Sequence, residues 1–410
     1  MLPEGWDRIR LSEGVSKIGS GVTPRGGEEA YKSEGFPLVR SQNVGWGRLL
    51  LGNVCFIDSE QHNAMAGTKL KSGDVLLNIT GASIGRVASY YGDDFGANVN
   101  QHVCIIRSDG SLEPRFIEAF LLSEFGQKQV DQFQAGGNRQ GLNFEQVGSF
   151  RLPRPPLPEQ RKIAEILSTW DQAIAAQERL IANARAQKKA LMQTLLTGNR
   201  RLPGFSGEWR SVCLGDIGKL RKGKGIQRDQ VRASGFPCIR YGEIYTQHHE
   251  QVRQFHSFID AETAAESEPI SAGDILFTCS GETAEEIGKC VAYLGNDKAY
   301  AGGDIIILSP TTANAAFLGY VLNDTAVTEQ KRRFGQGNSV VHISAANLAK
   351  LTFKPPDRAE QDAIASILDV ATDHIGGLEA ALTTLAQEKS ALMQQLLTGK
   401  RRVRVEELTA

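Results

Sequence analysis

The sequence predicts an α+β protein in which two repeated mixed α/β domains are joined by two long antiparallel helices that form a coiled coil. Three observations predict this fold. The second half of the chain repeats the first, each half ends in a long heptad-spaced apolar stretch, and short β-rich runs fill the rest of each half. The 410 residues are 41% hydrophobic and 23% charged, so the chain can bury a core along its whole length.

The repeat is most evident at the end of each half. Residues 190–201 read ALMQTLLTGNRR and residues 391–402 read ALMQQLLTGKRR, which gives ten identities in twelve at an offset of 201. Glu159-Gln160 likewise recurs as Glu360-Gln361. The segments between such anchors differ strongly, so we expect one scaffold that displays two different surfaces.

The globular part of each half is predicted to mix strands and helices. Short runs at 74–79, 103–106 and 305–308 are rich in β-formers and bounded by Gly, Asp or Ser, as buried strands are. Apolar spacing predicts short helices over 114–132 and 315–331.

A long helix is predicted to follow each domain, because apolar residues recur at alternating steps of four and three. Such a seam is typical of helices paired in a coiled coil, although two amphipathic helices packed on their own domains would also produce it. Length favours the coiled coil, since a helix over 159–197 would be about 58 Å long and would exceed a small domain. Pro155-Pro156 should precede the first helix, and Gly198 and Gly399 should cap the two ends. The expected seam residues are Ile163, Leu167, Trp170, Ile174, Ile181, Leu191 and Leu195, with Ile364, Leu368, Ile375, Leu378, Leu382, Leu385, Leu392 and Leu396.

Connectivity predicts the direction of the helices. The first helix delivers the chain through a short linker into the second domain, so the second helix starts where the first ends and can pair only by running back. The expected segments are a first domain (1–153), a first spacer helix (154–198), a second domain (199–354), a second spacer helix (355–402) and a tail (403–410). This is a pseudo-two-fold molecule made from a single chain.

Composition and the cysteines limit the classes of protein that fit. No apolar run reaches the ~18 residues of a membrane-spanning helix and the N-terminus lacks a basic and apolar leader, so we expect a cytoplasmic protein. The six cysteines are at least eleven residues apart, without the paired spacing of zinc or redox sites. We expect most of them to be buried as small hydrophobic side chains.

Two unlike domains held apart by a rigid rod suit a linear target with two recognition elements, and DNA is such a target. The repeated Leu-Met-Gln-x-Leu-Leu-Thr-Gly-x-Arg-Arg endings, and the Pro-Leu-Pro-Glu-Gln-Arg-Lys-Ile-Ala-Glu-Ile-Leu stretch at 156–167, resemble the specificity (S) subunits of type I restriction-modification systems. The resemblance covers essentially the whole chain, although the second helix lacks the Leu-Pro of the first copy.

The resemblance implies two target recognition domains, each of which reads one half of an asymmetric bipartite site, with the helices as a ruler between them. It also implies partners: double-stranded DNA, two modification subunits that bind S-adenosylmethionine, and restriction subunits that use ATP. The chain itself is expected to bind no cofactor. Its net charge of −1 requires any DNA surface to be local or shared with a basic partner.

No catalytic centre is predicted. The Pro-Pro motifs at 154–157 and 354–357 lack the Asp or Asn before Pro-Pro and the aromatic residue after it that adenine methyltransferases need, and the Gly-Lys-Cys at 288–290 lacks P-loop spacing. His248-His249 and His256 do not have metal-ligand spacing. Two rivals remain open at this point: a self-contained restriction or methylation enzyme, and a coiled-coil adaptor whose end domains bind proteins or glycans.

Candidate DNA-binding residues are those that read base edges or phosphates. In the first domain they could also be exposed turn residues or amides that satisfy the backbone. The candidates there are Arg40, Gln42, Asn43, Asn98, Asn100 and Gln101 for bases, with Lys17, Arg86 and Arg139 for phosphates.

The second domain offers two basic clusters and one loop that corresponds to Arg40–Asn43 in the repeat. The clusters could also be solvated helix faces, whereas the loop would present different base-reading groups on the same backbone. The candidates are Arg221, Lys222, Lys224, Lys331, Arg332 and Arg333 in the clusters, and Arg240, Tyr241 and Glu243 in the loop, where Glu243 could accept from cytosine.

Overall fold

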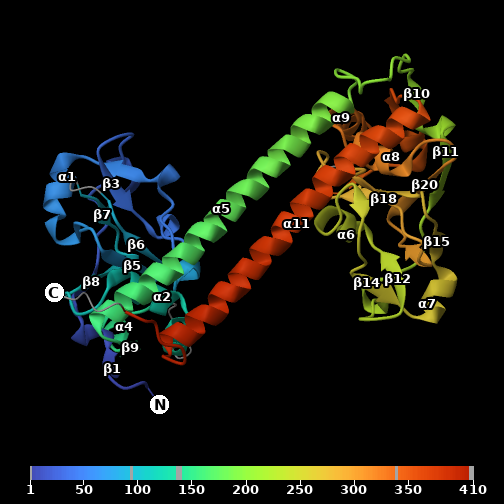
Figure 1. Cartoon of the computed structure of the whole chain (residues 1–410). Helices are drawn as coiled ribbons and strands as arrows, with labels where there is room; N and C mark the ends of the chain where they lie inside the picture. The colour runs from blue at the N-terminus through green and yellow to red at the C-terminus, as the bar shows by residue number, and fades with distance from the viewer. Residues whose placement is uncertain (1, 93–95, 135–140, 338–339, 406–410) are drawn as a thin grey trace. The chain divides into compact units, whose positions relative to one another are not determined.

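The structure is a computed structural model that describes residues 2–92, 96–134, 141–337 and 340–405 (Figure 1). The chain divides into two compact units, residues 1–178 with 380–410 (unit 1) and residues 179–379 (unit 2). Each unit therefore holds one globular domain and one stretch of each long helix. Among the described residues, no helix is long and apolar enough to cross a membrane.

Unit 1 contains a four-stranded sheet with the order β2-β8-β5-β6 and a three-stranded sheet with the order β4-β3-β7. All neighbouring strands are antiparallel except β3 and β7. Its strands are β1 (Asp7–Arg10), β2 (Val15–Ser20), β3 (Phe36–Val39), β4 (Cys55–Ile57), β5 (Asp74–Asn78), β6 (Val87–Tyr90), β7 (Asn98–Val99), β8 (Val103–Ser108) and β9 (Arg151–Arg154). Its shorter helices are α1 (Ser59–Ala64), α2 (Pro114–Leu122), α3 (Glu124–Gln134) and α4 (Phe144–Gly148).

Unit 2 repeats this plan. The order β11-β20-β16-β18 matches β2-β8-β5-β6, and β14-β12-β19 matches β4-β3-β7, with β13 and β15 added at the edges. Its strands are β10 (Val212–Cys213), β11 (Gly218–Lys222), β12 (Phe236–Ile239), β13 (Gln251–Val252), β14 (Ser257–Ile259), β15 (Glu268–Ile270), β16 (Ile275–Thr278), β17 (Ser280–Gly281), β18 (Cys290–Tyr293), β19 (Ala299–Ala301), β20 (Ile305–Pro310), β21 (Val341–His342) and β22 (Thr352–Phe353). Its shorter helices are α6 (Tyr241–Thr246), α7 (Ala261–Glu266), α8 (Ala315–Val321), α9 (Thr325–Phe334) and α10 (Ala345–Ala349).

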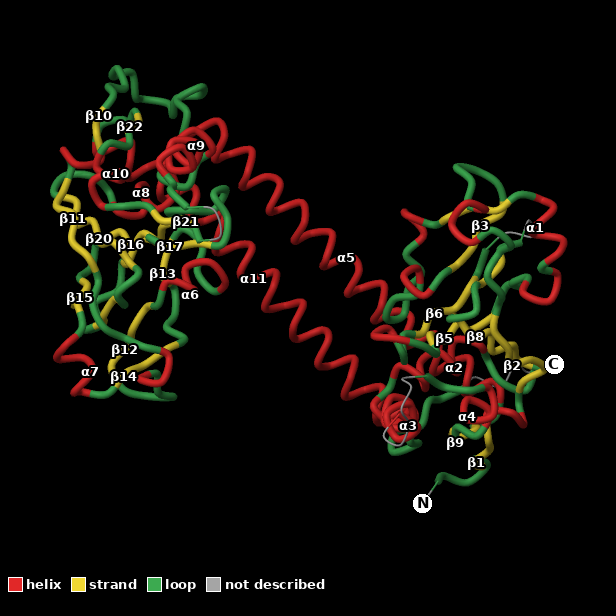
Figure 2. The backbone as a smooth tube through the Cα atoms, turned by 180° about the vertical axis from the view of Figure 1, so that it is seen from behind, coloured by secondary structure: helices red, strands yellow, loops and turns green. Residues whose placement is uncertain are grey.

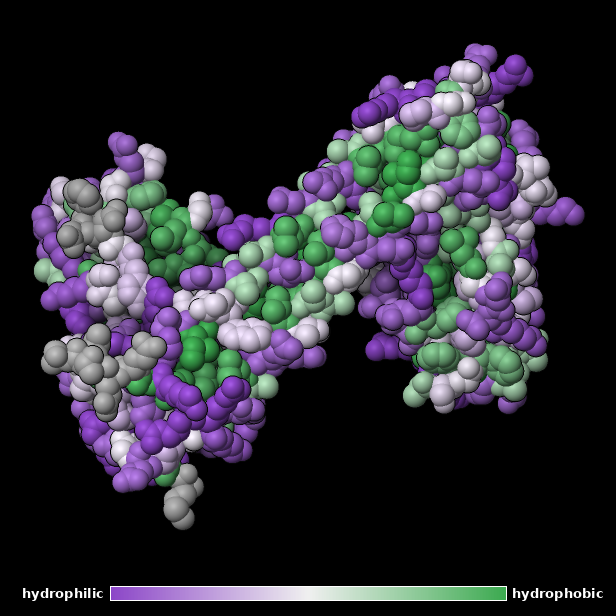
Figure 3. Space-filling view, in the orientation of Figure 1, coloured by the Kyte–Doolittle hydropathy of each residue, from purple (hydrophilic) through white to green (hydrophobic). Residues whose placement is uncertain are grey.

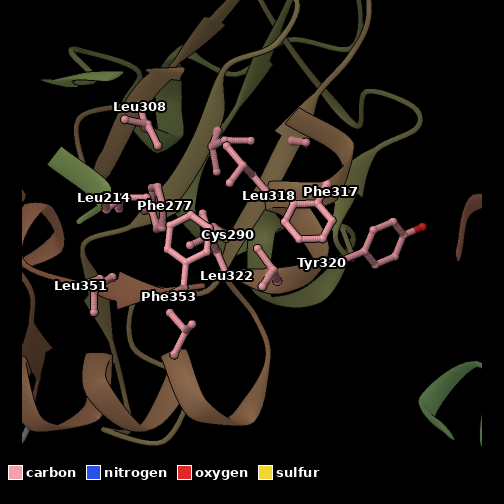
Figure 4. Packing of buried hydrophobic residues seen from close by; sticks show 14 of the residues in the cluster. Leu214, Phe277, Cys290, Leu308, Phe317, Leu318, Tyr320, Leu322, Leu351 and Phe353 are labelled. Atoms are coloured by element: carbon pink, nitrogen blue, oxygen red, sulfur yellow. The ribbon is translucent and has the colours of Figure 1, made fainter. Parts of the chain in front are cut away.

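The central strands are apolar along their length because both faces of the larger sheet are covered. In β5, Val75 and Leu77 join the core beneath the helices, whereas Leu76 joins the core shared with the smaller sheet. Unit 2 alternates in the same way, and Figure 4 shows Phe277 of β16 packed with Phe317 of α8 and their neighbours. The predicted strands at 74–79, 103–106 and 305–308 are confirmed as β5, β8 and β20.

The helices predicted over 114–132 and 315–331 are each two helices, so those predictions were wrong in extent. Ser123 separates α2 from α3, where its hydroxyl donates to the carbonyl of Phe120 at 2.6 Å and accepts from the amide of Gly126 at 3.3 Å. Asp324 starts α9 by accepting from the amide of Ala326 at 3.2 Å. These side chains cap a new helix where apolar spacing alone suggests continuity.

The two long helices are α5 (Leu157–Leu195, 39 residues) and α11 (Arg358–Leu397, 40 residues), drawn green and red in Figure 1. At about 1.5 Å per residue, α5 is about 58 Å long. Gly198 and Gly399 follow their ends with φ of 71° at each, the left-handed conformation of a helix C-cap. Every predicted seam residue is buried or half-buried, and hydrophobic and hydrophilic side chains alternate along both helices in Figure 3.

Within unit 1 the two helices run antiparallel. Ile163, near the start of α5, lies in the same core cluster as Leu396, near the end of α11. Two turns further along α5, Asp171 accepts from Lys389 at 2.5 Å. The partner number falls as the number along α5 rises, which only antiparallel pairing produces.

Unit 2 shows the same direction. Arg185 of α5 forms an ion pair with Glu379 of α11 at 2.6 Å. Further along α5, Leu195 lies in the same core cluster as Ile364, near the start of α11. Figure 2 traces the backbone of both helices from the opposite side. The predicted antiparallel direction is therefore confirmed inside each unit.

The repeated signature forms a buried ion-pair cluster in unit 2. Arg201, just beyond α5, donates to both carboxylate oxygens of Glu360 in the first turn of α11, at 2.8 and 2.6 Å. The indole Nε1 of Trp209 donates to the same carboxylate at 3.2 Å. The end of one helix is thereby attached to the start of the other.

Unit 1 contains the equivalent cluster, in which Arg402 and Trp6 both donate to Glu159 at the start of α5. The next residue of each Glu-Gln pair has a different task. Gln160 accepts from the backbone amide of Glu113 at 2.8 Å, and Gln361 accepts from that of Asn314 at 2.9 Å. The Glu-Gln motif thus attaches each long helix to the residue that precedes α2 or α8.

Candidate nucleic-acid interface

The loop after the first strand of the smaller sheet has the same construction in both units. In unit 1, Asn43 accepts from the backbone amide of Arg40 at 3.0 Å. In unit 2, Glu243 accepts from the backbone amide of Arg240 at 3.1 Å. The repeat therefore fixes one backbone turn, and the residues on that turn differ between the two domains.

In unit 1, three loops converge beside Arg40. Strands β3 and β7 are parallel, so the residues that follow them, Arg40 and Asn100, lie at the same edge, and the amide of Asn100 donates to the carbonyl of Val39 at 3.1 Å. Asn78, at the end of β5, donates to the carbonyl of Ser41 at 2.8 Å. The structure thus brings together two of the sequence-predicted clusters.

Arg40 itself is half-buried, with its guanidinium 5.1 Å from the centroid of the Tyr31 ring. Its Nε–H is buried and has no acceptor among the described residues. Gln42 beside it is exposed. Asn43 is only 1% exposed, and its amide group donates to the carbonyl of Leu50 at 2.9 Å, so its polar atoms maintain the turn.

The second predicted cluster contains one accessible side chain. Asn98 is fully buried and bonds His62, Met65 and Thr68. Asn100 is buried and accepts from the backbone amide of His102 at 3.2 Å. Gln101 is exposed and lies 2.9 Å from the His102 ring.

The predicted phosphate contacts of the first domain are less exposed than expected. Lys17 is half-buried and donates to the carbonyl of Gly67, and burial lowers the pKa of its ammonium group. Arg86 is half-buried and immediately precedes β6. Arg139 lies outside the described residues.

In unit 2, four predicted residues line one hollow of about 1000 Å³, namely Lys222, Arg240, Tyr241 and Glu243. The hollow lies at the ends of the parallel strands β12 and β19, which correspond to β3 and β7 of unit 1. Its other polar lining residues are Gln227, Arg228, Thr246, Gln247, His256, Ser257 and Asp304. The lining is therefore rich in side chains that can donate to base edges and phosphates.

Within the hollow, Glu243 is 6% exposed and accepts from the Ser257 hydroxyl as well as from the Arg240 backbone. The Arg240 guanidinium forms one longer contact with Glu243, at 3.3 Å. Tyr241 is 42% exposed beside them. A carboxylate that is buried and bonded twice supports the loop and is not presented to solvent.

The basic cluster at 221–224 is divided. Arg221 forms ion pairs with Glu268 at 2.9 Å and with Asp274 at 2.7 Å, so its charge is neutralised inside the fold. Lys222 and Lys224 are exposed.

The cluster at 331–333 is divided as well. Lys331 is 1% exposed and donates to the carbonyl of Gly288 at 2.8 Å, and burial lowers the pKa of its ammonium group. Arg332 and Arg333 are exposed but both bind Glu329, at 2.8 and 3.2 Å.

The family model described as the type I restriction modification DNA specificity domain matches residues 3–184 and 206–384, which is one match for each repeat. The chain belongs to this family. The resemblance predicted from the repeated motifs is thereby confirmed, and the alternative of an adaptor unrelated to DNA is not favoured.

Relatives cover nearly the whole length of the two specificity domains and their helices. A putative type I restriction enzyme specificity subunit, MjaX of Methanocaldococcus jannaschii, is 23% identical over 98% of this chain and 95% of its own. The StySPI specificity subunit of Salmonella potsdam is 22% identical over 97% and 88%. The crystal structure of a type I restriction-modification system S subunit from M. genitalium, 15% identical, shares the fold with a TM-score of 0.60 over 96% of each chain.

Several residues of the specificity domains were missed by sequence reasoning. In the second domain, Gln227, Arg228 and Gln247 line the hollow, although they stand apart from the clusters chosen from the sequence. In the first, Thr23 donates to Gln101 at 2.5 Å. These residues lie beside the predicted loops because the strands end there, and no local sequence motif identifies them. Among the described residues, no group of three or more His, Cys, Asp or Glu could hold a metal ion.

Proposed function

We propose that this chain is the DNA sequence-specificity subunit of a type I restriction-modification complex, in which each domain reads one half of an asymmetric bipartite site. The long helices set the gap between the half-sites and dock two modification subunits. The chain contributes recognition and no catalysis. Its partners bring S-adenosylmethionine for methylation and, where restriction subunits join, ATP for cleavage. A complex that modifies chromosomal DNA would act in the cytoplasm.

One observation carries the proposal: a turn capped at the same position presents different side chains in the two domains. The turn is fixed by Asn43 in one domain and by Glu243 in the other. The residues on it change from Ser41-Gln42 to Tyr241-Gly242. A shared backbone with exchanged side chains is what two readers of unlike half-sites require.

The proposed interface uses the accessible members of the predicted set. In the first domain these are Arg40, Gln42, Gln101, Lys17 and Arg86, and in the second they are Lys222, Lys224, Arg240, Tyr241, Arg332 and Arg333. The buried residues Asn43, Asn98, Asn100, Glu243 and Lys331 support the loops and strands behind them. Because the net charge of the chain is −1, the modification subunits would supply much of the attraction to phosphates.

The test is to produce the chain with candidate modification subunits and to sequence the modified bases of the host DNA. A stable complex and a methylated bipartite motif are expected. Arg40→Ala should relax one position of one half-site and leave the other half-site strict. Absence of both the complex and the motif would refute the proposed function. If Arg40→Ala weakens binding to all DNA sequences equally, Arg40 contacts a phosphate and not a base.

A further inference from the structure

Arg240 is a half-buried basic side chain of the hollow in unit 2 whose hydrogen bonds are incomplete. Its Nε–H is buried without an acceptor among the described residues, and its contact with Glu243 is 3.3 Å long. A buried donor without a partner typically costs about 1–3 kcal/mol. Moving the guanidinium toward an acceptor that enters the hollow would therefore remove this cost.

Two hydrogen bonds of Glu243 do not depend on the guanidinium. Its carboxylate accepts from the Arg240 backbone amide at 3.1 Å and from the Ser257 hydroxyl, and both bonds remain if the arginine side chain turns away. The same carboxylate caps the turn, so the backbone that carries Arg240 stays fixed. The loop is rigid while the reading side chain can move.

Charge decides which acceptor suits this position. Next to the buried Glu243 carboxylate, Arg240 forms a nearly neutral pair. A phosphate would therefore gain little attraction from Arg240 and would be repelled by the carboxylate. A guanine edge is uncharged and offers two acceptors, O6 and N7, to the paired N–H groups of arginine. Lys222 and Arg228 are exposed on the same hollow and are better placed to attract phosphates.

We infer that Arg240 is a specificity-determining residue of the second half-site, that it reads a guanine, and that Glu243 is its positioning residue. This inference rests on the proposed function and names the base class at one position. The positioning role replaces the direct cytosine contact predicted for Glu243, because its carboxylate oxygens are buried and bonded within the fold.

The experiment uses the full chain in complex with its modification subunits. Arg240→Ala and Arg240→Lys are compared with Arg228→Ala, a matched loss of one charge on the same hollow. We measure binding to duplexes with every base at each position of the second half-site, over a range of salt concentrations. The methylated motif of each variant is sequenced in parallel, and the first half-site serves as an internal control of folding.

Both Arg240 variants should lose about 5- to 150-fold of the discrimination at one guanine position, because lysine keeps the charge but not the paired donors. Arg228→Ala should weaken all sequences alike and reduce the salt slope by about one. Glu243→Gln should tighten binding to unrelated DNA, because it removes the neutralising acid while leaving an oxygen to cap the turn.

Two results would overturn the inference. If Arg240→Lys keeps every position strict and Arg240→Ala weakens all sequences alike, Arg240 is a phosphate contact. If the discrimination lost is against a base other than guanine, the assignment of the base is wrong. A wild-type complex without any bipartite motif would instead refute the proposed function, and this inference with it.

Discussion

Lengthening both helices by whole heptads tests whether they measure the gap between the half-sites. We would insert seven residues between Glu178 and Arg179 and seven between Glu379 and Ala380, where the two compact units meet in sequence. A heptad turns a helix through two turns within about 20°, so the apolar seam stays in phase. The ion pairs and core contacts inside each unit are left in place.

The expected change follows from the helix rise. Seven residues add about 10.5 Å to each helix, which corresponds to about three base pairs of DNA. Two heptads add about six base pairs and three add about nine, which approaches the ~34 Å repeat of the duplex. The preferred gap should grow by these steps while both half-site sequences stay unchanged.

Affinity should not change evenly along this series. Six base pairs turn the second half-site to the opposite side of the duplex, whereas nine return it close to its first orientation. We therefore expect the weakest binding with two heptads and recovery with three.

The assay is selection from a library of duplexes in which the gap between the half-sites varies. As a control, seven residues inserted at Ser206 in the linker lengthen the chain without lengthening either helix, and should leave the gap unchanged. A preferred gap that stays constant in the heptad series would show that the helices do not act as a ruler.

Three further predictions concern the folded state. Leu368→Ala should destabilise the protein by about 3 kcal/mol in denaturant titrations, because Leu368 is fully buried in the core of unit 2; a loss under 1 kcal/mol would contradict that packing. Burial lowers the pKa of Lys331, so the unfolded chain binds more protons at this group, and the contribution of Lys331 to stability should rise as pH approaches the ordinary lysine range; Lys331→Met should remove this contribution, measured as the difference in urea unfolding free energy between wild type and variant across pH, and leave the salt slope of DNA binding unchanged. Replacing Gly376 and Gly377 by Ala should raise stability by about 1 kcal/mol each, since nothing lies within 4 Å of the added Cβ atoms; an unchanged or lower Tm would contradict this.

The large-scale fold was predictable because it rests on features that recur in the sequence. The offset of about 200 residues predicts the matched sheets, and the apolar seam predicts α5 and α11 to within a few residues at each end. The division of α2 from α3 was not predictable from apolar spacing, because it depends on the Ser123 cap and on the close approach of the two consecutive helices. A Cβ on Gly126 would lie 2.4 Å from the carbonyl of Phe120, so the two helices approach too closely for another residue there.

The candidate site was predictable only in part, for a related reason. Arg40 and Arg240 were found because the repeat places them at equivalent positions. Asn98 looked equally suitable, but its partner His62 stands 36 residues earlier in the chain and becomes visible only when β3, β7 and α1 are in place. Whether an amide reads DNA or supports the fold depends on contacts that the local sequence does not contain.

Not every contact between the two long helices follows the repeat. The clusters around Glu159 and Glu360 are built from equivalent residues, one in each unit. Other ion pairs use residues that differ between the halves. Arg185 pairs with Glu379, but the position equivalent to Arg185 in the second helix is Ala386, which cannot form an ion pair.

A second asymmetric pair acts in the same way. Lys188 binds Glu250 of the second domain at 3.0 Å with both side chains largely buried, whereas its counterpart Lys389 binds Asp171 of the first long helix. Removing Lys188 would leave Glu250 largely buried without its cation, which is strongly unfavourable. The shared clusters therefore attach the helix ends in the same way in both units, whereas the unshared ion pairs give each unit contacts of its own.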